Sequence, residues 1–197
     1  MTGTEHEPSL AYLEALQEVT RRHRSRHGCN AYTFEDGAGL LALTQAEEAA
    51  RVLELGTAIG YTACLLASAT PSTYVDTIEG DAEHVVLARR NIEAAGLADR
   101  VTVHEGDFMA VMAGLDLSYD IAFFDGLGPT QPLIERLGSL LKPGGLLICS
   151  NVSLATSTER RKLTEALNRT TQWSAAAALK EGTTEVFRKL AQGQPAT

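Results

Sequence analysis

The fold of this chain is decided by the stretch Val52–Thr62, which reads VLELGTAIGYT. Its apolar beginning, Val52–Leu55, is typical of a buried strand, and the following residues Gly60–Ala69 are typical of a helix. Gly56 lies in the turn between them, and because glycine has no Cβ, a ligand can approach the backbone closely there. In an open parallel sheet such a ligand lies outside the carboxyl ends of the strands. The stretch therefore predicts a nucleotide-type cofactor at this turn.

The glycine spacing in this turn separates two classes of cofactor. A dinucleotide fingerprint reads GxGxxG, whereas this turn reads Gly56-x-x-x-Gly60 and lacks the middle glycine that a pyrophosphate requires. Glu54, just before the turn, disfavours a phosphate and can attract a cation, such as the amino group of a methionine moiety. These features favour S-adenosylmethionine over NAD.

Outward from this stretch, short apolar runs alternate with helical patterns. The other expected strands are Tyr74–Ile78, Val101–His104, Tyr119–Phe124, Leu146–Cys149, Trp173–Leu179 and Thr184–Leu190. The expected helices are Leu10–Val19, Gly37–Ala50, Asp81–Ala95, Asp107–Met112, Pro129–Leu141 and a segment from Thr156 to Arg169. Strands separated by helices predict an α/β fold with a mostly parallel sheet. The last two strands have a short connection, which predicts that they are antiparallel to each other.

Size and composition indicate one globular domain. The chain has 197 residues, of which 44% are hydrophobic and 21% charged. We expect a single domain over residues 1–197, with an N-terminal helical cap (1–50), a Rossmann-like core (51–191) and a loose tail (192–197). The net charge of −8 excludes a whole-surface basic footprint for nucleic acid, although it is compatible with a local patch.

The cysteines and the N-terminal residues indicate the cellular compartment. Cys29, Cys64 and Cys149 are far apart and form no CxxC pair, which indicates reduced thiols. The polar, acidic stretch Met1–Pro8 is neither a signal-peptide core nor a membrane span. We therefore expect a cytoplasmic protein with no membrane partner.

A basic run, Arg21–His27, follows the first expected helix. We interpret it as a solvated helix end, where cations also favour the helix macrodipole. The alternative is a contact with phosphate or an anionic substrate.

Three further strand ends carry candidate binding residues. Glu79 follows the glycine turn by roughly 20 residues, where a carboxylate can accept hydrogen bonds from both ribose hydroxyls. Asp107 and Phe108 can flank an adenine, although Asp107 also suits a helix N-cap. Asp125 ends an apolar strand and is expected to face the cleft, the alternative being a turn residue before Gly126.

Together these residues resemble the class I S-adenosylmethionine-dependent methyltransferases, and more narrowly the small O-methyltransferases of the catechol and caffeoyl-CoA type. The resemblance rests on Glu54–Thr57 followed by Gly60–Thr62, extends from Phe34 to the C-terminus, and includes Lys142–Gly145. It implies a Rossmann-like fold with a seven-stranded, mostly parallel sheet, an antiparallel last strand, and helices on both faces.

The resemblance also implies the roles of individual residues. Glu54, Gly56, Gly60, Tyr61 and Thr62 would line the methionine side, Glu79 would hold the ribose, Gly106–Phe108 would hold the adenine, and the stretch around Phe34 would cover the cofactor. The full set of expected cofactor-binding residues is Phe34, Glu54, Gly56, Thr57, Gly60, Tyr61, Thr62, Glu79, Gly106, Asp107, Phe108 and Asp125.

The chain departs from this family at the metal site. Family members hold a divalent ion, usually magnesium, between an aspartate after strand four and an Asp–Asn pair after strand five. Asp125 matches the first ligand, but the pair here reads Ser150-Asn151 and lacks one carboxylate. A serine hydroxyl is a weaker ligand for magnesium than a carboxylate. We hypothesise that magnesium binding at Asp125 and Asn151 is weak or absent.

The residues expected to face the methyl acceptor also depart from the family pattern. The catechol-type enzymes place a lysine that can act as base shortly after the first aspartate, and Asp125–Pro129 contains none. The acceptor should therefore differ from a catechol. Methyl transfer mainly needs alignment of the reactants, and a base only if the acceptor must lose a proton. Asp125 is the catalytic candidate, with His27 and Asp36 as further candidates.

The remaining histidines, His84 and His104, are interpreted as structural.

The preferred function is O-methylation of a small hydroxylated acceptor by a homodimeric enzyme. One alternative is a methyltransferase for hydroxyuridine in tRNA, supported only by Arg21–His27. Another is a protein that binds S-adenosylmethionine without transferring the methyl group, which the altered metal and base positions motivate.

Overall fold

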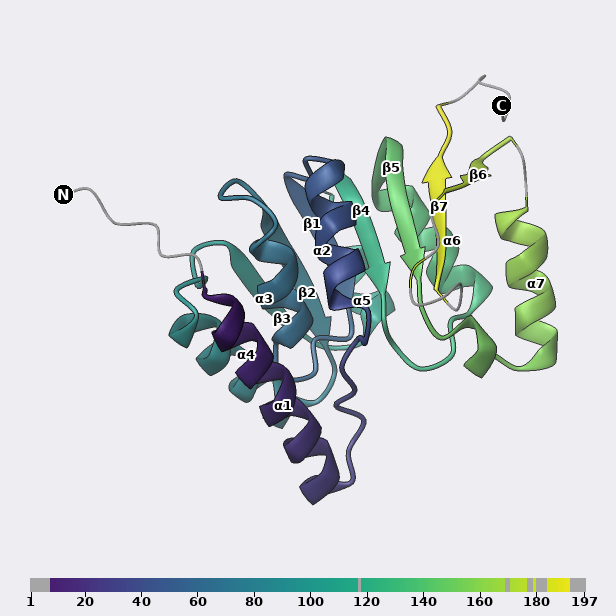
Figure 1. The fold of residues 1–197 in the computed structure, drawn as a ribbon. Helices are drawn as coiled ribbons and strands as arrows, with labels where there is room; N and C mark the ends of the chain where they lie inside the picture. The colour runs from purple at the N-terminus through teal and green to yellow at the C-terminus, as the bar shows by residue number, and fades with distance from the viewer. Residues whose placement is uncertain (1–7, 117, 169–170, 177–178, 180–183, 192–197) are drawn as a thin grey trace.

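The computed structural model describes residues 8–116, 118–168, 171–176, 179 and 184–191. In this part of the chain a seven-stranded sheet has the strand order β3-β2-β1-β4-β5-β7-β6 (Figure 1). The strands are β1 (Arg51–Leu55), β2 (Tyr74–Glu79), β3 (Val101–Glu105), β4 (Tyr119–Phe124), β5 (Leu141–Cys149), β6 (Trp173–Ala175) and β7 (Glu185–Lys189). Strands β1 to β5 are parallel, and β7 runs antiparallel between β5 and β6. The predicted sheet and its antiparallel last strand are confirmed.

Helices cover both faces of the sheet, as predicted (Figure 1). They are α1 (Leu10–His27), α2 (Gly37–Ala46), α3 (Tyr61–Ala67), α4 (Ala82–Ala94), α5 (Phe108–Ala113), α6 (Gln131–Leu140) and α7 (Ser157–Leu167), with a 3₁₀ turn η1 (Val152–Leu154). Residues of α1 to α4 share one buried cluster with one face of the sheet, and residues of α5 to α7 share a second cluster with the other.

The central strands explain why the core has two halves. Successive residues of a strand point to opposite faces, so Val52 packs in the first cluster and Leu53 in the second. Phe123 and Phe124 divide in the same way. Because both faces are buried, these strands are apolar throughout rather than alternating with polar residues. That is the pattern which predicted a parallel sheet.

Several predicted boundaries shift. Helix α2 ends at Ala46 rather than Ala50, because Glu48 has a positive φ of 47° that breaks the helix. Strand β5 begins at Leu141 rather than Leu146, since its pairing with β4 resumes after an irregularity that accommodates the Lys142–Gly145 turn. Strand β6 ends at Ala175 rather than Leu179.

Other predictions hold or fall outside the described residues. The basic run forms the exposed end of α1, as the solvated-end interpretation expected. Asp81 caps α4 by accepting hydrogen bonds from the backbone N–H groups of Glu83 and His84. The tail 192–197, residues 1–7, Arg169 and the connection 180–183 lie outside the described residues. Among the described helices, none is both long enough and apolar enough to cross a membrane.

Candidate functional site

A cavity of about 660 Å³ opens at the carboxyl ends of the parallel strands. Its wall is formed by residues that follow five strands and by the segment between α1 and α2, residues 28–36, here called the covering segment. The lining residues are Asn30, Tyr32, Thr33, Phe34, Glu35, Gly56, Ala58, Glu79, Gly80, Gly106, Asp107, Phe108, Asp125, Gly126, Leu127, Ser150, Asn151 and Leu154. This is the edge of the sheet at which the sequence predicted a cofactor.

The turn after β1 forms one wall of the cavity. Gly56 has a φ of +103°, and a Cβ there would lie 3.2 Å from the backbone of Asp125. Ala58 also has a positive φ, of 47°, and Gly60 has one of 96°. This succession of unusual conformations turns the chain sharply between β1 and α3. Glycine at position 56 is therefore required both by the backbone angle and by the closeness of the next strand end.

Glu79 is fixed against this turn. One carboxylate oxygen accepts a 2.8 Å hydrogen bond from the backbone N–H of Ala58, and the other accepts one of 2.9 Å from that of Asp81. The side chain is 15% exposed and lines the cavity. Its remaining lone pairs can accept hydrogen bonds from a ligand. The position suits the predicted ribose contact, which stays a prediction.

Glu54 lies beneath the turn rather than at the cavity surface. It is completely buried, and its Oε2 accepts a 2.6 Å hydrogen bond from the hydroxyl of Thr77. Burial raises the pKa of Glu54 to about 8, and the nearby carboxylates of Asp125 and Glu79 add to the effect. Thr57 is buried beside it, with its hydroxyl 2.6 Å from that of Thr77.

The predicted residues Gly60, Tyr61 and Thr62 are not among the residues that line the cavity, and Gly60 and Tyr61 pack against neighbouring helices. A Cβ on Gly37 would lie 2.6 Å from the hydroxyl oxygen of Tyr61, so α2 packs closely on this side chain. Thr62 is buried, and Gly60 packs against Ala88 of α4. Direct contact of these residues with a cofactor stays a prediction.

The residues that follow β3, Gly106–Phe108, form another part of the cavity wall. The backbone N–H of Gly106 donates a 2.9 Å hydrogen bond to the carbonyl oxygen of Glu79, which joins two strand ends. Asp107 caps α5 by accepting a 3.0 Å hydrogen bond from the N–H of Ala110, and it also lines the cavity. The ring of Phe108 lines the cavity and meets Phe124 edge to face at 6.4 Å. Asp107 is therefore the N-cap that the sequence allowed, and its contact with an adenine stays a prediction.

The two predicted metal candidates lie together. The side-chain N–H of Asn151 donates hydrogen bonds of 3.3 Å to Oδ1 of Asp125 and of 3.0 Å to the carbonyl oxygen of Gly126. The neighbouring Ser150 is buried and lines the cavity. This donor set offers one carboxylate, one hydroxyl and an amide whose nitrogen faces the carboxylate. Magnesium in proteins is usually held by one or two carboxylates together with water, and here a single carboxylate is paired with an amide nitrogen, so these residues fit it poorly.

The covering segment was predicted only around Phe34. That residue is buried and meets Phe123 edge to face at 5.2 Å, which anchors the segment to the sheet. Tyr32 is half exposed, and the guanidinium of Arg24 lies 3.7 Å above its ring. The cavity residues missed by the sequence analysis are Asn30, Tyr32, Thr33, Glu35, Ala58, Gly80, Gly126, Leu127 and Leu154. The signal for them in the sequence is that each lies within four positions of a residue that was predicted.

Of the three candidate bases, Asp125 alone is among the residues that line the cavity. Asp36 caps α2 by accepting a 2.9 Å hydrogen bond from the N–H of Gly39. His27 is exposed at the end of α1 and stacks on His23 at 4.5 Å. His104 forms a 2.8 Å contact with Asp76 near the sheet edge, which agrees with a structural role.

Comparison with known proteins agrees with this arrangement. The model of a family described as O-methyltransferase matches residues 4–173. A catechol O-methyltransferase of Mycobacterium tuberculosis is 38% identical over 151 residues, which cover 74% of this chain and 66% of that protein. One from Niastella koreensis is 32% identical over 160 residues, covering 77% and 69%. The structure of an O-methyltransferase from Bacillus cereus in complex with SAH shares the fold, with a TM-score of 0.75 at 24% identity, over 93% of this chain and 92% of that one. The chain belongs to the O-methyltransferase family.

Proposed function

We propose that this chain transfers a methyl group from S-adenosylmethionine to a hydroxyl of a small acceptor bound in the cavity. The observation that carries the proposal is the position of Glu79, held by two backbone N–H groups at the cavity wall next to the glycine turn. A carboxylate fixed in this way is ready to accept hydrogen bonds from a ribose without further ordering. Gly106–Phe108 stands beside it for the adenine. The relatives named catechol O-methyltransferase support the reaction class.

The chemistry divides between the donor and the chain. S-adenosylmethionine, when bound, supplies a methyl group on a positively charged sulfur. The chain contributes alignment, which can lower the barrier by up to about 7–11 kcal/mol. Asp125 lines the cavity and is the candidate to hold or accept the proton of the acceptor hydroxyl. We propose that this step does not use magnesium, because Ser150 replaces the second carboxylate.

The rim of the cavity suggests the kind of acceptor. Tyr32, Leu127 and Leu154 line the cavity and are 52%, 59% and 59% exposed. Exposed apolar side chains at the mouth of a cavity favour an apolar or aromatic ligand. We propose a small hydroxylated molecule with an apolar body.

The proposal is tested by binding and turnover together. Calorimetric titration with S-adenosylhomocysteine should show one site per chain, and Glu79→Gln should weaken it. A panel of small phenols and hydroxylated apolar molecules, incubated with S-adenosylmethionine and EDTA, should then yield a product heavier by one methylene. Cofactor binding without any product across the panel would favour a binding protein, and absence of cofactor binding would refute the proposal.

We also propose a cytoplasmic homodimer in which α1 contributes to the interface. Large apolar side chains on the exposed surface of α1, Leu10 (68% exposed) and Val19 (45% exposed), could be covered by a second copy of the chain. Light scattering should give twice the chain mass, and the double variant Leu10→Glu, Val19→Glu should shift it to the single mass. A single mass for the unmodified chain would refute the dimer.

A further inference from the structure

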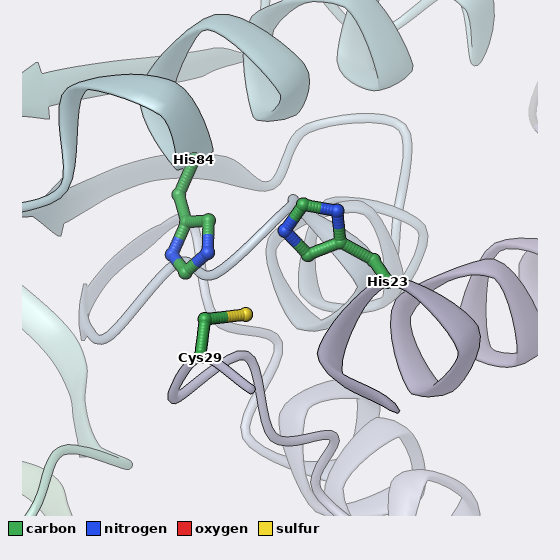
Figure 2. A group of neighbouring side chains, drawn as sticks. All are labelled: His23, Cys29 and His84. Carbon is green, nitrogen blue, oxygen red and sulfur yellow. The ribbon is translucent and has the colours of Figure 1, made fainter. Parts of the chain in front are cut away.

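Three potential metal ligands meet beside the cavity although they come from different parts of the fold. His23 belongs to the last turns of α1, Cys29 to the covering segment and His84 to the first turn of α4. Figure 2 shows a ring nitrogen of each histidine and the sulfur of Cys29 directed into the space between them. Their ligand atoms all lie within 4.8 Å of one another. None of the three was expected to act in this way from the sequence.

The local backbone explains how the cysteine reaches this position. Helix α1 ends at His27 and is followed by Gly28, whose φ of 63° is left-handed and reverses the direction of the chain. The next residue, Cys29, is thereby turned toward α4, where His84 is buried with only 7% of its side chain exposed. His23 and Cys29 are half-buried, so their side chains can still rotate.

The spacing is close to that of a coordinated ion. Zinc binds histidine nitrogen at about 2.0–2.1 Å and cysteine sulfur at about 2.3 Å, so ligand atoms on one tetrahedral ion stand about 3.3–3.6 Å apart. A closure of about 1.2–1.5 Å would bring atoms that are 4.8 Å apart to this range. Rotation of the partly buried His23 and Cys29 side chains would supply such a shift without moving the buried His84.

One carboxylate lies near this cluster. Oε1 of Glu79 lies 4.0 Å from Nδ1 of His84, which is too long for a hydrogen bond but places the carboxylate on the side of the ring that faces away from His23 and Cys29. Histidine ligands in proteins commonly direct their other ring nitrogen toward a carboxylate, which fixes the ring and makes it a better ligand. This arrangement leaves Nε2 of His84 to face His23 and Cys29.

We propose that His23, Cys29 and His84 form a zinc-type transition-metal site that fastens the covering segment to α4. Two imidazoles and a thiolate favour zinc or a similar soft to borderline ion over magnesium or calcium, which prefer oxygen ligands. Three protein ligands leave a fourth position for water, as in open zinc sites.

The site has a consequence for the cavity, and this part rests on the proposed function. Cys29 is followed by Asn30, which lines the cavity, and Nδ1 of His84 lies 4.0 Å from the carboxylate that is proposed to hold the ribose. A bound ion would therefore order one end of the covering segment and one side of Glu79 together. Zinc and S-adenosylmethionine should then strengthen each other's binding, since coupling between sites is reciprocal.

The site is tested on full-length, reduced, chelator-treated protein. Zinc is titrated in competition with a chromophoric chelator, and cobalt is added separately to detect a thiolate-to-metal absorption band. We expect one zinc per chain, and a cobalt band that Cys29→Ser abolishes. Cys29→Ser and His23→Asn should each weaken zinc binding by more than about 100-fold, since loss of an outer-shell partner alone costs about 10–100-fold. His104→Asn, which removes a histidine elsewhere, should bind zinc like the unmodified chain.

The outcomes are distinct. Absence of stoichiometric zinc binding by the unmodified chain would overturn the site, and so would zinc binding by Cys29→Ser and His23→Asn as tight as that of the unmodified chain. Both variants alter half-buried residues, and circular dichroism verifies that they fold. Zinc binding is measured without cofactor, so its result does not depend on methyl transfer. The affinity for S-adenosylhomocysteine is then measured with and without zinc; an unchanged value would refute the coupling while leaving the methyltransferase proposal intact.

Discussion

The hydroxyl of Thr77 donates a 2.6 Å hydrogen bond to Oε2 of Glu54 in the middle of the sheet. Within the described part of the chain, the other oxygen of Glu54 is buried without a hydrogen-bond partner. An ionised carboxylate in such a place is costly, and this cost raises the pKa of Glu54 to about 8. The carboxyl is therefore largely protonated at neutral pH. A cationic group brought near the unpartnered oxygen would favour the charged form.

The protonated Glu54 makes stability depend on pH. The carboxyl of Glu54 has a pKa of 4.5 when unperturbed and about 8 in the folded chain. At a pH between 4.5 and 8, unfolding therefore releases a proton from this group. Its contribution to the free energy of unfolding is full below pH 4.5, decreases as pH rises, and is lost once pH passes 8. The slope reaches at most about 1.4 kcal/mol per pH unit.

Glu54→Gln should remove this contribution. Urea unfolding of both proteins from pH 5 to pH 9 gives a difference curve in which the other titrating groups cancel. We expect the unmodified chain to lose stability relative to the variant as pH rises through this range. Parallel curves would show that Glu54 is ionised in the folded chain.

Loss of the Glu79 carboxylate should weaken cofactor binding. Hydrogen bonds to a charged group contribute about 1.5–3 kcal/mol, so Glu79→Gln should reduce the affinity for S-adenosylhomocysteine by about 10–100-fold. Glu93→Gln on the exposed face of α4 is the matched control and should leave the affinity unchanged. Calorimetric titration measures both. Equal affinities for the two variants would show that the Glu79 carboxylate does not bind the cofactor.

Gly56 and Gly144 allow backbone strain to be separated from crowding. Their φ values are +103° and +84°, but a Cβ on Gly56 would meet the backbone of Asp125 at 3.2 Å, whereas one on Gly144 would meet nothing within 4 Å. Gly144→Ala should therefore cost only the strain, about 1–2 kcal/mol. Gly56→Ala should cost more and should also weaken cofactor binding, because the two strand ends must separate. Urea unfolding measures the costs, and equal values would show that crowding at Gly56 is relieved freely.

The alternation of apolar strands and helices was sufficient to predict the sheet. A parallel sheet whose strands are apolar on both faces must be covered by helices on both faces. It also predicted the strand-end residues Gly56, Glu79 and Asp125, since parallel strands bring their carboxyl ends to one edge. The boundaries of β5 were harder to predict. Pro143 and two glycines interrupt the apolar pattern there, although pairing with β4 continues on both sides of them.

The parts that could not be predicted depend on contacts between distant segments. Tyr32 reaches the cavity only because Phe34 anchors the covering segment against Phe123 of β4. His84 was interpreted as structural because its own helix offers no partner. Its neighbours His23 and Cys29 come from α1 and the segment after it, and no spacing in the sequence indicates that they meet.

Ser150→Asp should create the magnesium site that the unmodified chain is expected to lack. An aspartate at this buried position would stand next to Asn151 and near Asp125, supplying the second charged oxygen ligand. Without the ion, the added charge is buried and should lower the melting temperature; magnesium should restore it. Ser153→Asp, on the exposed side of η1, is the control and should respond to neither. Calorimetric titration with magnesium, manganese and calcium, together with thermal unfolding, distinguishes the three proteins. Micromolar magnesium binding by the unmodified chain that depends on Asp125 would contradict the prediction, because it would mean that the Ser150 hydroxyl and the Asn151 amide suffice as ligands.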